Sequence, residues 1–160
     1  MKSIYLFLFL IVKLAWSKTI YVDDNSSTGG NGSSWGSSYR YLQDAISSAV
    51  SGDEVWVAEG TYKPDQGFEE TTGDRKKSFR LVDGVSIIGG FAGVEKELPA
   101  RGKFKDTILT GKISTGSKNS YHVVVAENIS DPKTILKGFT IKNGVASGGV
   151  IGTEVHSIGG

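Results

Sequence analysis

One segment of the chain, residues 41–62, changes its hydrophobic period halfway, and this change constrains the fold more than any other feature. In the first half, apolar residues recur three and four positions apart, which predicts an amphipathic helix. These positions are Leu42, Ala45, Ile46, Ala49 and Val50. In the second half, Val55 and Val57 alternate with Trp56, as they would on a strand. We therefore expect a helix over residues 37–51, followed directly by a strand.

The residues around this helix indicate how it begins and ends. Ser37 or Ser38 is expected to cap the start, because a hydroxyl accepts a hydrogen bond from an unpaired amide of the first turn. Gly52 stands where helices often end in a left-handed residue. Gly60, shortly after the strand, predicts another turn of the chain.

The first 17 residues have the three parts of a secretory signal peptide. Lys2 supplies the positive charge, residues 4–12 are an unbroken apolar run, and Ala15 and Ser17 place small side chains at the cleavage site. The run is shorter than the roughly 20 residues that span a bilayer, although an uncleaved anchor is the alternative. We expect a chain without a membrane span that begins at Lys18 and is secreted or held at the cell surface (the outer membrane in a bacterium).

Composition narrows the classes of partner. The chain has no cysteine, so a secreted form relies on packing or metal instead of disulfides. Loss of Lys2 and Lys13 with the signal changes the formal net charge from +1 to −1. No basic surface for nucleic acid is therefore expected. Three N-glycosylation sequons begin at Asn25, Asn31 and Asn128, and they matter only in a eukaryotic source.

The mature chain, residues 18–160, is expected to form one domain. Residues 18–36 read as a first strand and a loop rich in glycine and serine. Residues 53–160 read as short strands interrupted by two polar excursions, residues 63–77 and 94–105. The predicted strands are 19–22, 79–81, 85–88, 107–109, 121–126, 134–136 and 139–141. The strand at 121–126 is almost wholly apolar, which predicts cover on both faces.

The spacing of the strands indicates a repeat architecture. No second helix separates them, so a doubly wound sheet is not expected. Ile87, Ile108 and Ile135 recur at intervals inside the roughly 20–50-residue window of solenoid repeats. An antiparallel sandwich also uses short strands and glycine turns, and it is the alternative. The spacing favours a β-solenoid.

Two segments resemble right-handed parallel β-helix proteins of the pectin lyase-like class. Residues 136–144 (LKGFTIKNG) resemble one rung, and residues 41–62 resemble the opening coil, whose helix plugs the solenoid end. The resemblance implies an all-β fold, a right-handed parallel β-helix with one N-terminal capping α-helix. It also implies that Phe139 and Ile141 point inward and that Asn143 forms a corner.

A narrower resemblance concerns bacterial cell-surface β-helix proteins, including those related to polymorphic outer-membrane proteins. Residues 19–35 and 84–91 are similar to their N-terminal region, and residues 148–151 (GGVI) resemble half of their repeat signature. The other half, Phe-x-x-Asn, does not occur in the sequence. Because no cap follows Ile141, we expect a β-helix truncated at the C-terminus, its last edge covered by further rungs or a partner.

The sequence offers few candidates for chemistry. Asp23, Asp24 and Asn25 form the densest oxygen cluster and loosely suggest a calcium loop, whereas Asx turns after a strand are the favoured interpretation. By strand alternation His122 lies opposite Val123 and is expected to face solvent. Neither His122 nor His156 has the nearby acidic partner that a catalytic histidine needs. We therefore predict no catalytic residue and no cofactor, with calcium left open.

The two polar excursions are the expected binding loops, because ligand residues usually lie on loops held by a rigid scaffold. Phe68 on the first, and Arg101 and Phe104 on the second, are the candidate residues. An exposed aromatic ring can stack on a sugar, although packing of the ring against the body of the protein is the favoured interpretation.

We expect a non-catalytic, adhesin-like module that binds carbohydrate or a cell-surface protein. A first alternative is the N-terminal part of a polysaccharide lyase, hydrolase or epimerase whose active site lies in further rungs. A second alternative is a structural spacer.

Overall fold

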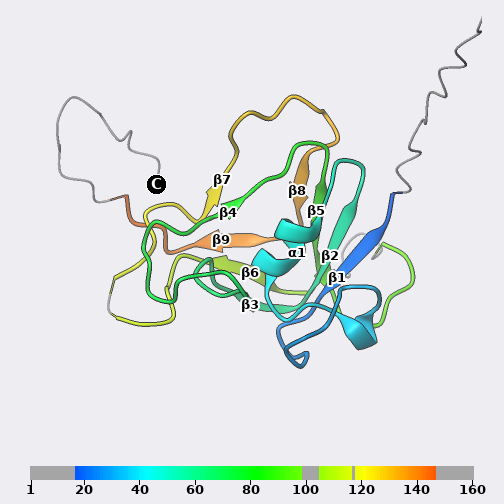
Figure 1. Ribbon diagram of the computed structural model, residues 1–160, viewed down its shortest axis with the longest axis horizontal. Helices are drawn as coiled ribbons and strands as arrows, with labels where there is room; N and C mark the ends of the chain where they lie inside the picture. The colour runs from blue at the N-terminus through cyan, green and yellow to red at the C-terminus, as the bar shows by residue number, and fades with distance from the viewer. Residues whose placement is uncertain (1–16, 99–104, 117, 147–160) are drawn as a thin grey trace, which may run out of the picture.

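The computed structural model describes residues 17–98, 105–116 and 118–146. These residues form nine strands, one α-helix and one 3-10 turn (Figure 1). The helical elements are η1 (Trp35–Ser37) and α1 (Leu42–Ser48). The strands are β1 (Thr19–Val22), β2 (Glu54–Ala58), β3 (Gly60–Tyr62), β4 (Phe79–Arg80), β5 (Ser86–Phe91), β6 (Thr107–Thr110), β7 (Val124–Val125), β8 (Ile135–Lys137) and β9 (Thr140–Lys142).

The strands form three sheets, ordered β1-β2-β5-β8, β3-β6-β9 and β4-β7, and every pairing between them is parallel. From β4 onward the chain visits the three sheets in the same order twice. The predicted all-β class is thereby confirmed. Ile87, Ile108 and Ile135, whose spacing suggested a repeat, do not occupy equivalent positions. Ile108 lies in a different sheet from Ile87, and Ile135 pairs with Ser86 instead of Ile87.

Helix α1 is shorter than the predicted range of 37–51. Tyr41 precedes it in an extended conformation, and no side chain caps its start, so the predicted serine cap is wrong. The Ser38 hydroxyl lies instead beside that of Ser26. The helix ends at Ser48, and the Val50 amide donates a hydrogen bond to Asp53. Val50 is 56% exposed, so it does not belong to the predicted apolar face.

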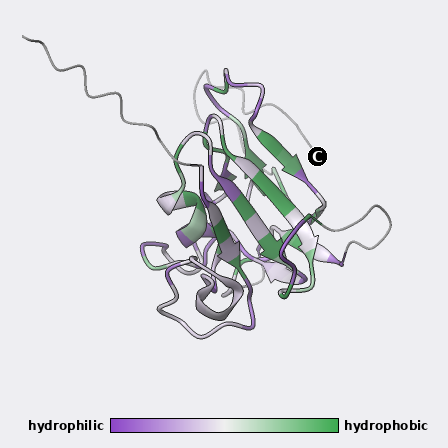
Figure 2. Cartoon of the chain, turned by 90° about the vertical axis from the view of Figure 1, so that its right-hand side faces the viewer, coloured by the Kyte–Doolittle hydropathy of each residue, from purple (hydrophilic) through white to green (hydrophobic). Residues whose placement is uncertain are grey.

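The sequence reading of the strand that follows the helix is confirmed. Gly52 has a φ of +96°, in the left-handed region where glycine is favoured. Val55 and Val57 are fully buried in the main core with Leu42 and Ile46 of the helix. Figure 2 shows hydrophobic residues gathered along neighbouring strands of the fold. The helix therefore closes the core at the β1 end, as an amphipathic element should.

The outer face of the β1-β2-β5-β8 sheet carries a second, aromatic cluster. The Trp56 and Phe91 rings stack with centroids 4.6 Å apart and an interplanar angle of 15°. Tyr21 and Trp35 meet these rings edge-on or tilted. The Trp35 indole also donates a hydrogen bond of 2.8 Å to the Glu95 carbonyl, so the 23–38 loop is fastened over this face.

The C-terminal strands differ from expectation. Of the predicted strand 121–126, only Val124 and Val125 are paired, and both are half-buried, so cover on both faces is wrong. Tyr121, at the start of the predicted strand, lies before β7, and its ring packs against the Arg75 guanidinium, 4.3 Å from the ring centroid. Ile141 pairs with fully buried Leu109 and so lies on the expected inward face, but it is 51% exposed because β9 is the last described strand of its sheet.

Other predictions for this region are confirmed. Phe139 packs against the main core, and Asn143 adopts a φ of +65° at the predicted corner. His122 is exposed. No helix among the described residues has the length and apolar character needed to cross a bilayer. The expected signal peptide, apart from Ser17, and the terminal segment 148–160 lie outside the described residues.

Candidate binding cleft beside helix α1

The first polar excursion, residues 63–77, is held to the body of the protein by two carboxylates. Asp44 of helix α1 accepts a hydrogen bond of 2.7 Å from the Phe68 amide. Buried Asp65 accepts bonds from the amides of Gly73 (2.9 Å) and Ser114 (2.7 Å). Charge-assisted bonds of this kind are stronger than neutral ones. The loop is therefore fixed in place despite having no regular secondary structure.

Phe68 stands at the tip of this loop, and its residue is 91% exposed. Packing of the ring against the body, which the sequence favoured, is therefore wrong. The Asp44 bond holds the backbone of Phe68 while its ring remains free in solvent. A large apolar ring held out on an anchored loop is available to a ligand.

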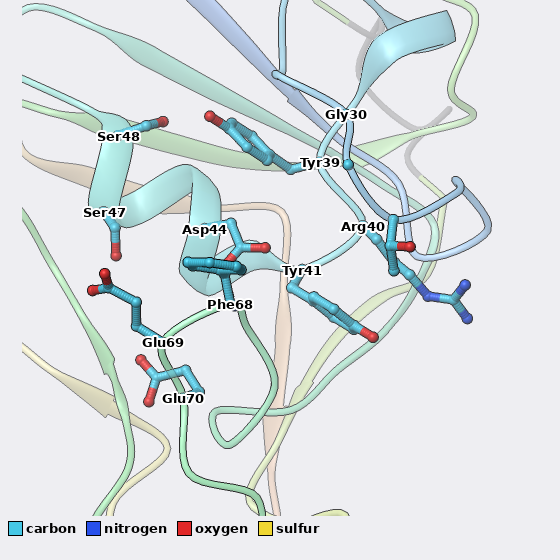
Figure 3. A pocket seen from close by; sticks show the side chains of 12 residues that line it. Gly30, Tyr39, Arg40, Tyr41, Asp44, Ser47, Ser48, Phe68, Glu69 and Glu70 are labelled. Atoms are coloured by element: carbon cyan, nitrogen blue, oxygen red, sulfur yellow. The ribbon is translucent and has the colours of Figure 1, made fainter.

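Phe68 borders a hollow of about 590 Å³, which we call the aromatic cleft. Figure 3 shows its side chains projecting from helix α1, from the segment just before it and from the 68–70 loop. Its volume falls within the range of about 300–1,000 Å³ that is typical of small-molecule sites. Its lining combines rings, carboxylates and hydroxyls: Thr28, Gly29, Gly30, Tyr39, Arg40, Tyr41, Asp44, Ser47, Ser48, Phe68, Glu69 and Glu70.

The charges of the aromatic cleft are mainly negative. Asp44, Glu69 and Glu70 contribute carboxylates, whereas Arg40 is its one basic lining residue. Glu70 forms an ion pair with Lys77 outside the cleft, with Oε2 and Nζ 2.7 Å apart. The bond to Glu70 raises the pKa of the Lys77 ammonium. Two of the three carboxylates are thus engaged with groups of the protein itself.

A smaller hollow of about 210 Å³, the polar hollow, shares Arg40 and Tyr41 with the aromatic cleft. Its other lining residues are Asp24, Leu42, Thr61, Tyr62, Lys63 and Gln66. Asp24 is fixed there, because its Oδ2 accepts a bond of 2.9 Å from the Thr61 amide.

Tyr62 forms the buried base of the polar hollow. Its hydroxyl donates to the Ala58 carbonyl at 3.1 Å and accepts from the Asp24 amide at 3.3 Å. Burial, followed by the negative charge of Asp24, strongly raises the pKa of this phenol. The hydroxyl therefore stays protonated and structural.

The suggested calcium residues have partners within the chain. The Asp23 carboxylate accepts a bond of 2.9 Å from the Asn25 amide, which is an Asx turn, so the favoured interpretation is confirmed. Asp24 is engaged by Thr61, and Asn25 is exposed. Within the described ranges, no three or more His, Cys, Asp or Glu side chains gather as metal ligands would.

The other sequence candidates lie apart from the cleft or are not placed. Asn25, Asn31 and Asn128 are all exposed, so each sequon is accessible, and its occupancy stays a prediction. Arg101 and Phe104 lie outside the described residues.

The cleft also contains residues that sequence reasoning missed. Tyr39 and Tyr41 precede the helix, and Asp44 lies on its polar face. Two tyrosines separated by one residue near the start of the predicted helix are the sequence signal that could have identified these lining residues. Comparison of the chain with protein-family models, curated proteins and solved structures gave no match. The cleft itself therefore carries the functional argument.

Proposed function

We propose that this chain is a secreted or cell-surface module that binds carbohydrate in the aromatic cleft, without catalysis. The scaffold in this proposal is a right-handed parallel β-helix of the pectin lyase-like class with α1 as its N-terminal cap. The repeated order of the three parallel sheets supports the scaffold. So do two residues in the left-handed conformation, Gly138 between β8 and β9 and Asn143 directly after β9.

Phe68 carries the functional proposal. Its exposed ring stands beside hydroxyls and carboxylates that hydrogen-bond to sugars, and Tyr39 and Tyr41 add two more rings to the lining. Sugar rings have apolar C–H faces and polar edges, so a stacking surface bordered by polar groups matches both. A protein partner would bury a larger and more continuous apolar surface than one ring provides.

The engaged carboxylates support binding over catalysis. A glycoside hydrolase needs two carboxyl groups directed at the same bond, one as acid and one as base or nucleophile. In the cleft, Asp44 is bonded to the Phe68 amide and Glu70 to Lys77. Two of the three carboxylates thus already have structural partners, which supports binding over a role as acid or nucleophile.

Calorimetric titration of the purified chain with cello-oligosaccharides tests the proposal. These sugars are suitable probes because their hydroxyls are all equatorial, which leaves flat C–H faces for stacking. Phe68→Ala is expected to weaken binding by about tenfold or more. Val94→Ala is the matched control, because Val94 is 78% exposed and does not line either hollow. Equal affinity in both variants, or no binding by the unaltered chain, would contradict the proposal.

A further inference from the structure

The aromatic cleft and the polar hollow have two lining residues in common. Arg40 and Tyr41, which immediately precede helix α1, border both of them. The loop that carries Phe68 in the cleft also carries Lys63 and Gln66 in the hollow. The same two segments of chain therefore contribute to the walls of both spaces.

From this arrangement we infer that the two spaces form one extended site for an oligosaccharide longer than two sugar units. This inference rests on the proposed carbohydrate function. One unit stacks on Phe68 in the aromatic cleft, and the chain continues past Tyr41 into the polar hollow. There Lys63, Gln66 and Thr61 supply hydrogen-bonding groups.

Size supports a subsidiary role for the polar hollow. At about 210 Å³ it is smaller than the roughly 300 Å³ at which independent ligand sites begin. Next to the larger cleft, it provides room for the continuation of a bound ligand. A rigid wall favours such binding, because Asp24 is fixed by Thr61 and does not need ordering when the ligand arrives.

Charge determines which sugars fit each end. Asp44, Glu69 and Glu70 line the aromatic cleft, so a uronate stacked on Phe68 meets like charge. The polar hollow has Arg40 and Lys63 against the single carboxylate of Asp24. The unit over Phe68 is therefore an uncharged sugar, and a ligand made entirely of uronates is disfavoured.

Calorimetry with glucose, cellobiose, cellotetraose and tetragalacturonate on the full chain tests this inference. Cellotetraose is expected to bind about tenfold or more tighter than cellobiose and glucose, since only the longer chain reaches both spaces. Tetragalacturonate is expected to bind at least about tenfold more weakly than cellotetraose, and added salt narrows that gap by screening.

Lys63→Ala locates the second end of the site. This variant is expected to weaken the binding of cellotetraose by roughly threefold to tenfold, which corresponds to the loss of one hydrogen bond. Its affinity for cellobiose should change by no more than about twofold. Lys137→Ala, an exposed lysine on β8, is the charge-matched control and leaves both affinities unchanged.

Three results overturn the extended site: equal affinity for cellobiose and cellotetraose, an equal effect of Lys63→Ala on both, or tighter binding of tetragalacturonate. If Phe68→Ala still weakens binding in those cases, the proposed function stands and only the extended site fails. If no sugar binds the unaltered chain, both proposals fail together.

Discussion

The Asp44 carboxylate lies 2.7 Å from the backbone amide nitrogen of Phe68, which joins helix α1 to the tip of the first polar loop. The apolar face of this seven-residue helix packs in the main core, and its polar face holds the loop of residues 63–77. The same helix thus links the stability of the domain's end to the geometry of the cleft.

Loss of this link is expected to affect binding more than folding. Asp44→Ala removes the acceptor for the Phe68 amide and is expected to weaken the binding of cellotetraose about tenfold. Asp44→Asn keeps an acceptor oxygen and should retain most of the affinity, which marks Asp44 as a positioning residue. Lys137→Ala, which changes an exposed residue that lines neither hollow, is the control. Calorimetry that shows equal loss in the Ala and Asn variants would contradict this role.

The buried face of α1 is expected to be essential for folding. Ile46→Asp places a charge against the apolar core, which costs several kcal/mol and should abolish soluble folded protein. Ser47→Asp introduces the same charge one residue further on, at an exposed position, and should be mild. Thermal melts of both variants check this prediction. Similar melting temperatures for the two variants would contradict a capping role for helix α1.

Asp83 is expected to make stability depend on pH in acid. Hydrogen bonds from the Asp131 amide and from Ser130 hold the pKa of this carboxyl at about 2, below its usual value of 3.8. Between these two values the unfolded chain binds more protons, so stability rises with pH. The contribution is complete above about pH 4–5 and is lost as the pH falls toward 2.

Urea unfolding between pH 2 and pH 6 measures this effect. The unaltered chain should lose stability over this range more steeply than Asp83→Asn, which cannot titrate at that position. Matching slopes in the two proteins would show that Asp83 has an ordinary pKa.

Cleavage of the leader after Ser17 is expected to create a new ion pair. The Lys18 backbone nitrogen lies 3.1 Å from Oδ1 of Asp53, a residue that is 2% exposed. Once that nitrogen is a free ammonium, the bond to Asp53 becomes charge-assisted, worth roughly 1.5–3 kcal/mol. Sequencing of the exported protein should begin at Lys18.

The variant Asp53→Asn distinguishes the stabilisation by this ion pair from the stabilisation by the other contacts of Asp53. It should lower the melting temperature of the exported chain more than that of a chain retaining residues 1–17. An exported protein that begins elsewhere, or equal shifts in both chains, would contradict the prediction.

We further expect the chain not to cleave polygalacturonate or cellotetraose. Glu70 is paired with Lys77, and Asp44 is held by Phe68, so the cleft lacks a free carboxyl pair. Assays for new reducing ends and for unsaturated products, with and without calcium, check this. Turnover that Glu69→Gln abolishes would show that the cleft is an active site.

The features predictable from sequence were those with a local cause. Alternation of Val55, Trp56 and Val57 placed each side chain on its face, because strand geometry depends on adjacent residues alone. Gly52 adopts the expected left-handed conformation, although the helix ends before it, at Ser48. The polar excursion 63–77 was also recognisable from composition.

Long-range contacts account for the rest. Helix α1 ends at Ser48, and the Val50 amide beyond it bonds to Asp53, a contact that the apolar pattern does not signal. The cleft depends on the Asp44–Phe68 bond between segments far apart in the sequence, so its residues could not be grouped beforehand. The exposure of Phe68 follows from that same bond, and sequence reasoning therefore favoured the wrong alternative.

Chemical-shift mapping of the isotope-labelled chain with cellotetraose tests the central claim most directly. We expect the largest amide shifts at Tyr41, Asp44 and Phe68, smaller shifts at Lys63, and none in β8 or β9. Shifts confined to β8 and β9, or no shifts at saturating cellotetraose, would contradict a carbohydrate site beside helix α1.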